Sequence, residues 1–315
     1  MATVSSRVVR FHEYGEPLDV LREERIEIFD PAPGRLRVRV LATGLNPADW
    51  ELCRGFLRGT LPRGIGCDVA GVVDAIGDGV DDVSVGDLVA GAADVAEQES
   101  AGAADYAILA SWTRVPAGLD PVQAAVLRTV VQTAVWTLDA MGVDAHTTLL
   151  VHGAGSMVGY AAVQVARERG ATVIATAGRA LAADLEGFGA KVTAYGAGMG
   201  DRVRALADGA IDLVLDAAPS TVGTIPALIA IAGDPGHVFT VSNHADAREL
   251  GAVVNLDLLR GGGGLPTDPM PDYVAKAARG EFRLPIARAF ALDDWRSAAG
   301  LSLSRAAHGK VVLRP

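Results

Sequence analysis

The feature that most constrains the fold is a glycine-rich turn between an apolar run and an amphipathic segment. The stretch LLVHGAGSMVG begins at Leu149 and places glycines at positions 153, 155 and 159. Where a strand passes into a helix, unpaired backbone N–H groups and the positive helix end attract an anion, and glycine lets a phosphate approach closely. The spacing G-x-G-x-x-x-G departs from the strict G-x-G-x-x-G. Its position at the start of a strand–helix series nevertheless predicts a dinucleotide site.

After this turn, short apolar runs alternate with helical segments. The runs ATVIATAG, KVTAYG, IDLVLDAA and HVFTVSN are separated by segments with helical spacing, among them ALAADLEGFGA and RVRALADG. Such alternation predicts parallel strands joined by right-handed crossovers. Before the turn, PVQAAVLRTVVQTAVWTLDAMG also has helical apolar spacing. We therefore expect an α/β fold whose doubly wound, parallel-sheet domain spans residues 119–258.

Both ends of the chain have a different character. Residues 1–118 contain short apolar segments separated by Gly, Pro and Asp clusters, and LRVRV alternates as a half-buried strand does. This pattern predicts a β-rich, largely antiparallel or barrel-like domain. Near the C-terminus, PDYVAKAARGEF predicts a helix and GKVVLRP a strand with no neighbours of its own. We expect this strand to return to the first sheet, so the β-rich domain comprises residues 1–118 and 259–315. The glycine run 261–264 is either a mobile lid or a tight linker.

Charge and hydropathy exclude several classes of protein. Acidic residues outnumber basic ones by 38 to 28, a formal net charge of −10, and no basic block could neutralise nucleic-acid phosphates. No apolar run reaches the roughly 18–20 residues that cross a bilayer. The N-terminus lacks the features of a signal peptide, so we expect a cytoplasmic protein with no membrane partner. The two cysteines, Cys53 and Cys67, form neither a disulfide framework nor a zinc motif.

The end of the strand after the glycine turn indicates which dinucleotide binds. An NAD site usually carries an Asp or Glu there, bonded to the ribose 2′-hydroxyl. Here the strand ends in Thr176, Ala177, Gly178 and Arg179, with no carboxylate. Arg179 could bind a 2′-phosphate, although it could also be a solvated surface arginine. We predict NADPH as the cofactor.

Several motifs, in order along the chain, resemble the medium-chain dehydrogenase/reductase superfamily, and most closely its zinc-free quinone oxidoreductase (zeta-crystallin-like) branch. The matching segments are VVRFHEYGEP, ATGLNPADW, GCDVAGVVDAIGDGV with VGDLV, QTAVWTL, VHGAGSMVGYAAVQVA and HGKVVL. The resemblance implies a GroES-like catalytic domain formed by both chain ends, with a Rossmann domain inserted between them. It also implies a homodimer and hydride transfer from the nicotinamide to a quinone or another electron-poor enone.

The chain departs from this family pattern at two places. Ser156 and Met157 stand in the turn where the branch has or often has glycine, and the bulkier Met157 would narrow the turn. The catalytic zinc ligands of the zinc-dependent branch match Asn46, Cys67 and about Thr129, of which only Cys67 would ligate strongly. The four-cysteine structural-zinc lobe is also absent. We therefore expect no metal.

The resemblance also suggests residues for the chemistry. Asn46 would donate to the substrate oxygen or, alternatively, cap the loop before Pro47. Glu51 would relay a proton if it points inward, although a solvated glutamate is the simpler alternative. Thr133 would contact the nicotinamide carboxamide. Substrate-pocket candidates are Trp50, Trp136 and Asn243, and both tryptophans fit core packing equally well.

Other polar residues in these motifs receive structural or cofactor roles. We expect Asp49 to hold loop N–H groups and His152 to be packed rather than catalytic. The cofactor-binding residues expected from the turn and the resemblance are Gly153, Gly155, Ser156, Met157, Val158, Gly159, Thr176, Ala177, Gly178, Arg179, Tyr195, Ala217, Val241, Ser242, Asn243 and Lys310. Lys310 would contact a phosphate or the cleft edge.

Three functions are compatible with these features. The first is an NADPH-dependent, zinc-independent reductase of quinones or α,β-unsaturated carbonyl compounds. The second is an enoyl reductase that acts on a carrier- or CoA-bound or polyketide-type intermediate. The third is a non-catalytic or redox-neutral NADPH-binding protein.

Overall fold

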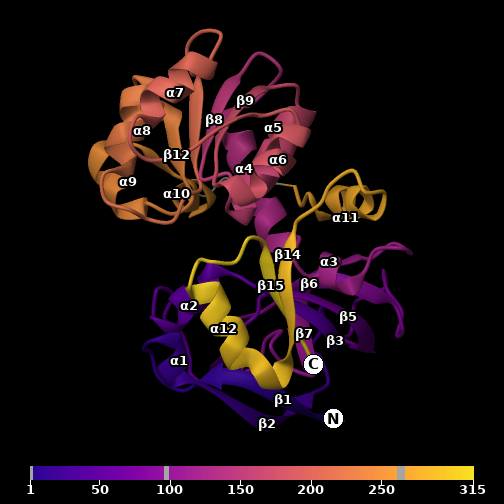
Figure 1. Cartoon of the computed structure of the whole chain (residues 1–315). Helices are drawn as coiled ribbons and strands as arrows, with labels where there is room; N and C mark the ends of the chain where they lie inside the picture. Colours follow the sequence, from indigo (N-terminus) through magenta and orange to yellow (C-terminus); the bar gives the residue numbers. More distant parts are fainter. Residues whose placement is uncertain (1–2, 96–98, 261–266) are drawn as a thin grey trace. The chain divides into compact units, whose positions relative to one another are not determined.

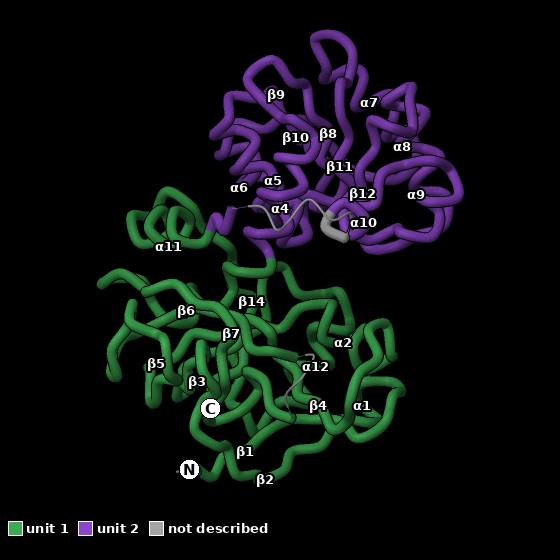
Figure 2. The backbone as a smooth tube through the Cα atoms, turned by 180° about the vertical axis from the view of Figure 1, so that it is seen from behind, with its two compact units in different colours: residues 1–129, 270–315 green, residues 130–269 purple. Residues whose placement is uncertain are grey.

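The computed structural model describes residues 3–95, 99–260 and 267–315, which form two compact units (Figure 1, Figure 2). Unit 1 comprises residues 1–129 and 270–315, and unit 2 comprises residues 130–269. These limits lie about eleven positions later than those expected from the sequence, because the helices at both crossings pack on unit 1. The glycine run 261–264 lies outside the described residues.

Unit 1 contains a three-stranded and a six-stranded sheet. The strands of the small sheet are β1 (Thr3–Phe11), β2 (Leu21–Phe29) and β4 (Arg63–Gly64), in the order β2-β1-β4. Those of the large sheet are β3 (Leu36–Leu45), β5 (Asp68–Ile76), β6 (Leu88–Ala93), β7 (Tyr106–Arg114), β14 (Ile286–Ala291) and β15 (Lys310–Arg314), in the order β14-β15-β3-β5-β6-β7. An additional pairing of β3 with β7 closes part of this sheet into a barrel, as expected of a barrel-like domain.

The C-terminal strand returns to the first sheet, as its sequence predicts. Strand β15 pairs antiparallel with β3, with Val311 opposite Leu45, and parallel with β14 on its other side. The helices of this unit are α1 (Pro17–Val20), α2 (Pro47–Cys53), α3 (Pro121–Ala124), α11 (Met270–Ala278) and α12 (Trp295–Leu303), with the 3-10 turn η2 (Leu292–Asp294).

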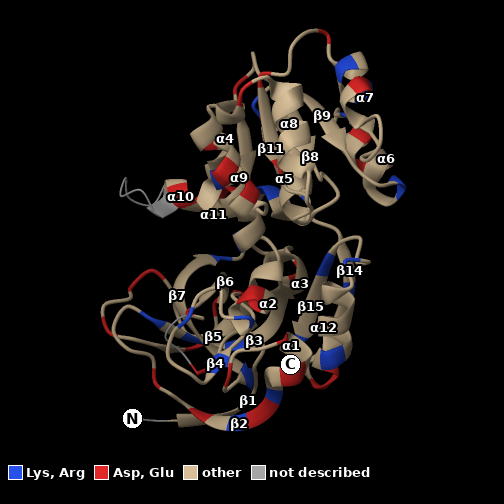
Figure 3. Ribbon diagram, turned by 90° about the vertical axis from the view of Figure 1, so that its left-hand side faces the viewer, with Lys and Arg blue, Asp and Glu red and all other residues tan. Residues whose placement is uncertain are grey.

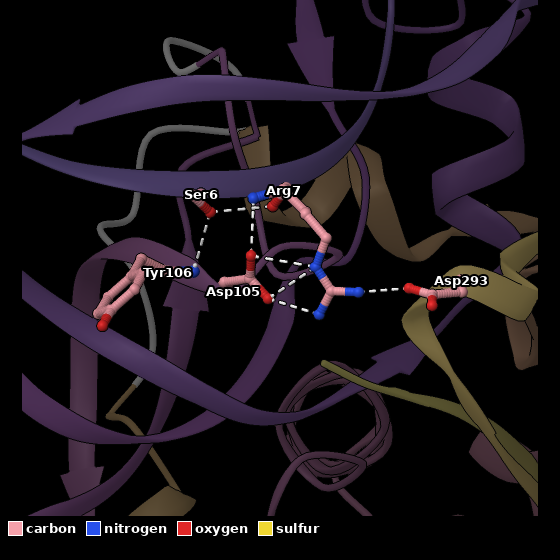
Figure 4. A network of polar contacts seen from close by, with 5 residues as sticks. All are labelled: Ser6, Arg7, Asp105, Tyr106 and Asp293. Carbon is pink, nitrogen blue, oxygen red and sulfur yellow. Dashed lines mark hydrogen bonds and ion pairs between the residues drawn. The ribbon is translucent and has the colours of Figure 1, made fainter.

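A polar network also connects the two ends of the chain within unit 1 (Figure 4). Asp105 accepts from the backbone N–H of Arg7 at 2.7 Å and from its guanidinium at 2.7 Å. The same guanidinium pairs with Asp293 of η2, and the Ser6 hydroxyl accepts from the backbone N–H of Tyr106. These bonds fix β1 against β7 and the C-terminal segment.

Unit 2 has the predicted doubly wound architecture. Its parallel strands are β8 (Thr148–His152), β9 (Thr172–Thr176), β10 (Lys191–Thr193), β11 (Leu213–Asp216), β12 (Val238–Thr240) and β13 (Val253–Val254). Their order β10-β9-β8-β11-β12-β13 is that of the Rossmann fold. The order reverses beside β8, and in such sheets ligands bind at the carboxyl ends of the strands next to this point.

Helices cover both faces of the sheet in unit 2 (Figure 1). They are α4 (Arg128–Met141), α5 (Met157–Glu168), α6 (Arg179–Gly187), α7 (Met199–Leu206), α8 (Thr224–Ala232), α9 (His244–Leu250) and α10 (Asn255–Arg260), with the 3-10 turn η1 (Pro235–His237). Helices α5 and α6 lie on one face, and α7, α8 and α9 on the other. Buried aliphatic residues such as Leu150, Val214 and Leu228 form the core beneath α7 and α8.

Candidate functional site

The glycine turn of unit 2 is held to the neighbouring strand by two hydrogen bonds. The Gly153 N–H donates to the Thr176 hydroxyl oxygen at 3.1 Å, and the Ala154 N–H donates to the Thr176 carbonyl at 2.9 Å. Gly153 has a φ of 75°, and a Cβ there would lie 2.4 Å from the nitrogen of Ala218. The turn therefore requires glycine at this position for both conformation and space.

Helix α5 begins with several unused donors. The Ser156 hydroxyl caps the helix by accepting from the Gly159 N–H at 3.1 Å. The N–H groups of Gly155, Met157 and Val158 have no acceptor within the described part of the chain. A Cβ on Gly155 would meet nothing within 4 Å, so space is open beside these donors. Three free N–H groups at the positive end of a helix suit a pyrophosphate, and Ser156 and Met157 leave the turn intact.

The end of β9, where the adenosine ribose is expected to bind, is partly exposed. Thr176 and Ala177 are buried, whereas Gly178 and Arg179 are exposed at the start of α6. Residues 176–179 include no carboxylate, and no hydrogen bond to Arg179 occurs among the described residues. Tyr195, 62% exposed, follows the adjacent strand β10, and Arg202 bonds the carbonyls of its loop.

The ends of β11 and β12 lie beside the turn in the same sheet. Ala217 is buried and donates its N–H to the His152 carbonyl at 2.9 Å. Asn243 is 2% exposed, and its amide is already used by Asp216 and by the backbone N–H of Thr221. The substrate-pocket role expected for the Asn243 side chain is therefore corrected to a structural one. The backbone of residues 241–243 remains a cofactor candidate.

Helix α4 carries two further candidates. Thr133 is half-buried, and its carbonyl accepts from the Thr137 hydroxyl at 2.6 Å. Trp136 is also half-buried, and its indole N–H donates to the Thr267 carbonyl at 3.1 Å. Trp136 thus holds the segment that precedes α11, and its role as a pocket wall stays a prediction.

A buried polar cluster in unit 1 contains two of the three residues that match zinc-ligand positions, Asn46 and Thr129. We call it the Asp68 cluster, and it consists of Asn46, Asp49, Asp68, Thr129 and Lys310. Lys310 Nζ donates to Asn46 Oδ1 at 2.5 Å, and Asn46 Nδ2 donates to Asp68 Oδ2 at 3.0 Å. Asp68 Oδ1 accepts from the Thr129 hydroxyl at 2.6 Å and from its backbone N–H at 3.1 Å. Asp68 therefore caps the start of α4 from another element of the fold.

This arrangement gives Lys310 and Asn46 partners within unit 1. Lys310 is 4% exposed and its ammonium donates to Asn46 Oδ1, and the phosphate or cleft-edge contact expected of it stays a prediction. Burial lowers the pKa of its ammonium, against the opposing effect of Asp68 and Asp49. Both polar atoms of the Asn46 amide are bonded within the cluster, which favours positioning over donation to a substrate.

Asp49 has the structural role that the sequence suggested. Its carboxylate accepts from the backbone N–H groups of Asn46 and Gly66, both at 2.7 Å. Burial raises its pKa to about 6, although the two backbone donors and Lys310 oppose this shift.

The two remaining candidates in α2 lie elsewhere than expected. Trp50 is 3% exposed in the core of unit 1, and its indole N–H donates to Ser302 at 3.0 Å, so the structure assigns it to packing rather than to a pocket wall. Glu51 is exposed and pairs with Arg54 at 2.9 Å. This corresponds to the solvated alternative and contradicts an inward proton relay.

Two further properties concern metals and membranes. Across residues 3–95, 99–260 and 267–315, no group of three His, Cys, Asp or Glu side chains could hold a metal ion. No helix in these same segments is long and apolar enough to span a bilayer. Basic and acidic residues are interspersed on both units (Figure 3).

The chain is similar to known proteins in both sequence and fold. Residues 32–122 match the alcohol dehydrogenase GroES-like domain. Over 177 residues the chain is 34% identical to human quinone oxidoreductase, covering 55% of this chain and 53% of that protein. It is 40% identical over 159 residues to a mycocerosic acid synthase-like polyketide synthase of Mycobacterium tuberculosis, covering 49% of this chain and 7% of that protein. The chain thus spans about half of the human relative and a small part of the synthase.

The fold agrees over nearly the whole chain. A quinone oxidoreductase from Coxiella burnetii aligns with a TM-score of 0.82 at 24% identity, covering 99% of this chain and 100% of that one. A GroES-like unit joined to a Rossmann unit is the arrangement shared with these proteins. The similarities support the medium-chain dehydrogenase/reductase superfamily, and its quinone oxidoreductase branch in particular. This similarity implies a nicotinamide cofactor.

Proposed function

We propose that the protein is an NADPH-dependent, zinc-independent reductase that transfers hydride to a quinone or an α,β-unsaturated carbonyl compound. The observation that carries this proposal is the set of free N–H donors on Gly155, Met157 and Val158 at the carboxyl edge of a Rossmann sheet. The quinone oxidoreductase relatives support the reaction class. We further propose that the protein acts as a cytoplasmic homodimer.

Some of these residues would bind the cofactor, and others would orient its nicotinamide ring. When bound, the reduced nicotinamide supplies the hydride. The glycine turn holds the phosphates, Arg179 and Tyr195 bind the adenosine end, and the backbone of residues 241–243 together with Thr133 orients the nicotinamide. Quinones and enones are electrophilic, so hydrogen bonding is sufficient to polarise them.

The Asp68 cluster supports zinc independence. The buried Nζ of Lys310 lies 2.5 Å from the Asn46 amide oxygen and donates to it, so this oxygen is already used. A divalent cation bound there would have to displace Lys310.

Replacing Arg179 with alanine should weaken NADPH binding and leave NADH binding unchanged. Loss of a charge-assisted hydrogen bond costs about 1.5–3 kcal/mol, which corresponds to a roughly 10- to 100-fold rise in Kd for NADPH. Fluorescence titration of both cofactors measures this effect. Arg204→Ala, which removes an exposed arginine paired with Asp201, is the control. Equal losses for both cofactors would contradict the role of Arg179.

The polyketide synthase relatives favour a second candidate function, reduction of an enoyl group on a carrier- or CoA-bound intermediate. Initial rates of NADPH oxidation with free quinones, cyclic enones and enoyl thioesters separate the two. We expect free quinones or enones to give the highest kcat/KM, and preference for the thioesters would establish the second candidate. NADPH binding without oxidation of any substrate would instead favour a non-catalytic role.

A further inference from the structure

Four neighbouring strands of the unit 2 sheet end on a polar residue. In sheet order these are Thr176 of β9, His152 of β8, Asp216 of β11 and Thr240 of β12, which we call the polar row. Asp216 lies in register with His152 on one side and with Thr240 on the other. Each of the four residues is at most 8% exposed. Buried polar groups require partners, and these residues find them in the loops that follow the strands.

Asp216 is the shared acceptor of one half of the row. Its Oδ2 accepts from the Thr240 hydroxyl at 2.8 Å and from Asn243 Nδ2 at 2.6 Å, and its Oδ1 accepts from the Ala218 N–H at 3.2 Å. Asn243 Oδ1 in turn accepts from the Thr221 N–H at 3.0 Å. One buried carboxylate therefore fixes both the loop after β11 and the loop after β12.

Thr240 extends this support to the backbone after β12. Its hydroxyl oxygen accepts from the N–H groups of Ser242 and Asn243 at 3.1 and 3.0 Å. The Ser242 hydroxyl donates to the Ala218 carbonyl at 2.5 Å, which joins the two loops directly. The conformation of residues 241–243 thus depends on the polar row.

Thr176 serves the other half of the row. Its hydroxyl oxygen accepts from the Gly153 N–H and lies 2.9 Å from His152 Nδ1. Among the described residues, the hydrogen bonds of the Asp216 carboxylate go to Ala218, Thr240 and Asn243 and not to the Gly153 turn. The turn expected to take the phosphates and the loops after β11 and β12 are therefore held by different side chains.

We propose that Asp216 is a positioning residue that fixes residues 217–221 and 241–243 for the nicotinamide end of the cofactor, whereas Thr176 fixes the turn for the phosphate end. This inference rests on the proposed function. Asparagine at position 216 is the informative replacement, because it keeps the shape of the side chain. A carboxamide has one acceptor oxygen, so in either orientation its NH₂ group faces at least one of the existing donors.

The test compares kcat with the binding of a cofactor fragment. For Asp216→Asn we expect a kcat about ten-fold or more below wild type, the effect of leaving a buried donor unpaired. The Kd of 2′-phosphoadenosine 5′-diphosphoribose, which lacks the nicotinamide, should be unchanged. The wild type should bind NADPH more tightly than this fragment, whereas Asp216→Asn should bind the two with similar Kd values. Thr176→Val should instead raise the Kd of the fragment.

Two further variants serve as controls. Asp212→Asn changes an aspartate before the other end of β11, where it accepts from the Thr148 N–H at 2.7 Å, and should leave both readouts unchanged. Thr240→Val keeps the Asp216 carboxylate but removes one of its donors. If Asp216→Asn does not fold, Thr240→Val should still show a lower kcat with an unchanged Kd for the fragment. An unchanged kcat in Asp216→Asn, or equal losses of kcat and fragment affinity, would overturn this inference but not the proposed function. A wild-type protein that binds neither NADPH nor the fragment would overturn the proposed function as well.

Discussion

Replacing Lys310 with methionine should lower the free energy of unfolding by about 1–3 kcal/mol, the usual effect of leaving a buried hydrogen-bond acceptor without its donor. The ammonium is buried beside Asp68 and Asp49 and donates to the Asn46 amide oxygen. Methionine fills a similar volume but leaves the two carboxylates uncompensated and the amide oxygen without its donor. Urea unfolding at pH 7.5, followed by fluorescence and circular dichroism, measures the loss.

Lys276→Met is the matched control in the same unit. Lys276 pairs with Asp272, whose side chain is 60% exposed, one helical turn away on α11, and a pair with one exposed partner contributes little. If Lys310→Met were no less stable than Lys276→Met, the Asp68 cluster would not depend on the ammonium.

The stability deficit of Lys310→Met should shrink as the pH falls from 7.5 to 5. Burial raises the pKa of Asp49 to about 6, above its value in the unfolded chain. Its protonation therefore stabilises the folded state, fully so at low pH, and this contribution is lost as the pH rises through about 6. Without Lys310 the pKa of Asp49 should rise further, so protonation rescues the variant more than the wild type. A deficit that is constant over this pH range would contradict this explanation.

Replacing Gly159 with alanine should weaken NADPH binding by about 10- to 100-fold, because overpacking costs about 1–3 kcal/mol. An alanine Cβ at this position would lie 2.5 Å from the carbonyl oxygen of Gly153, within the turn itself. The turn must then open, which displaces the N–H donors of Met157 and Val158. Isothermal titration with NADPH measures the change.

Gly187→Ala is the control for this substitution, since a Cβ at Gly187 in α6 would meet nothing within 4 Å. It should bind NADPH as the wild type does. Wild-type affinity in Gly159→Ala would show that the turn does not hold the cofactor.

Local sequence patterns predicted most of unit 2, and tertiary contacts explain where they failed. Strand β8, the turn and helix α5 follow directly from apolar periodicity and glycine spacing. The expected helical stretch from residue 121 to 142 is broken into α3 and α4. At the second start, Thr129 bonds Asp68, which comes from a distant strand and which periodicity cannot reveal. The short strand β13 gave no signal because it has only two residues.

The candidate site could be predicted where its residues are adjacent in the sequence, and not where strand pairing brings distant residues together. The turn and the acid-free end of β9 could be recognised from adjacent residues. Lys310 was expected to contact a phosphate or the cleft edge, and its bond to Asn46 was not foreseen, because only the pairing of β15 with β3 brings the two residues together. Asp216 was missed as a site residue, although an acid at the end of the apolar run IDLVLD is a usable signal.

The most direct test of the central claim is the rate of NADPH and NADH oxidation with a quinone acceptor, each measured with and without a zinc chelator. We predict turnover with NADPH, a much lower kcat/KM with NADH, and no effect of the chelator. Turnover that prefers NADH, or activity that is lost on chelation and restored by added zinc, would contradict the proposed function.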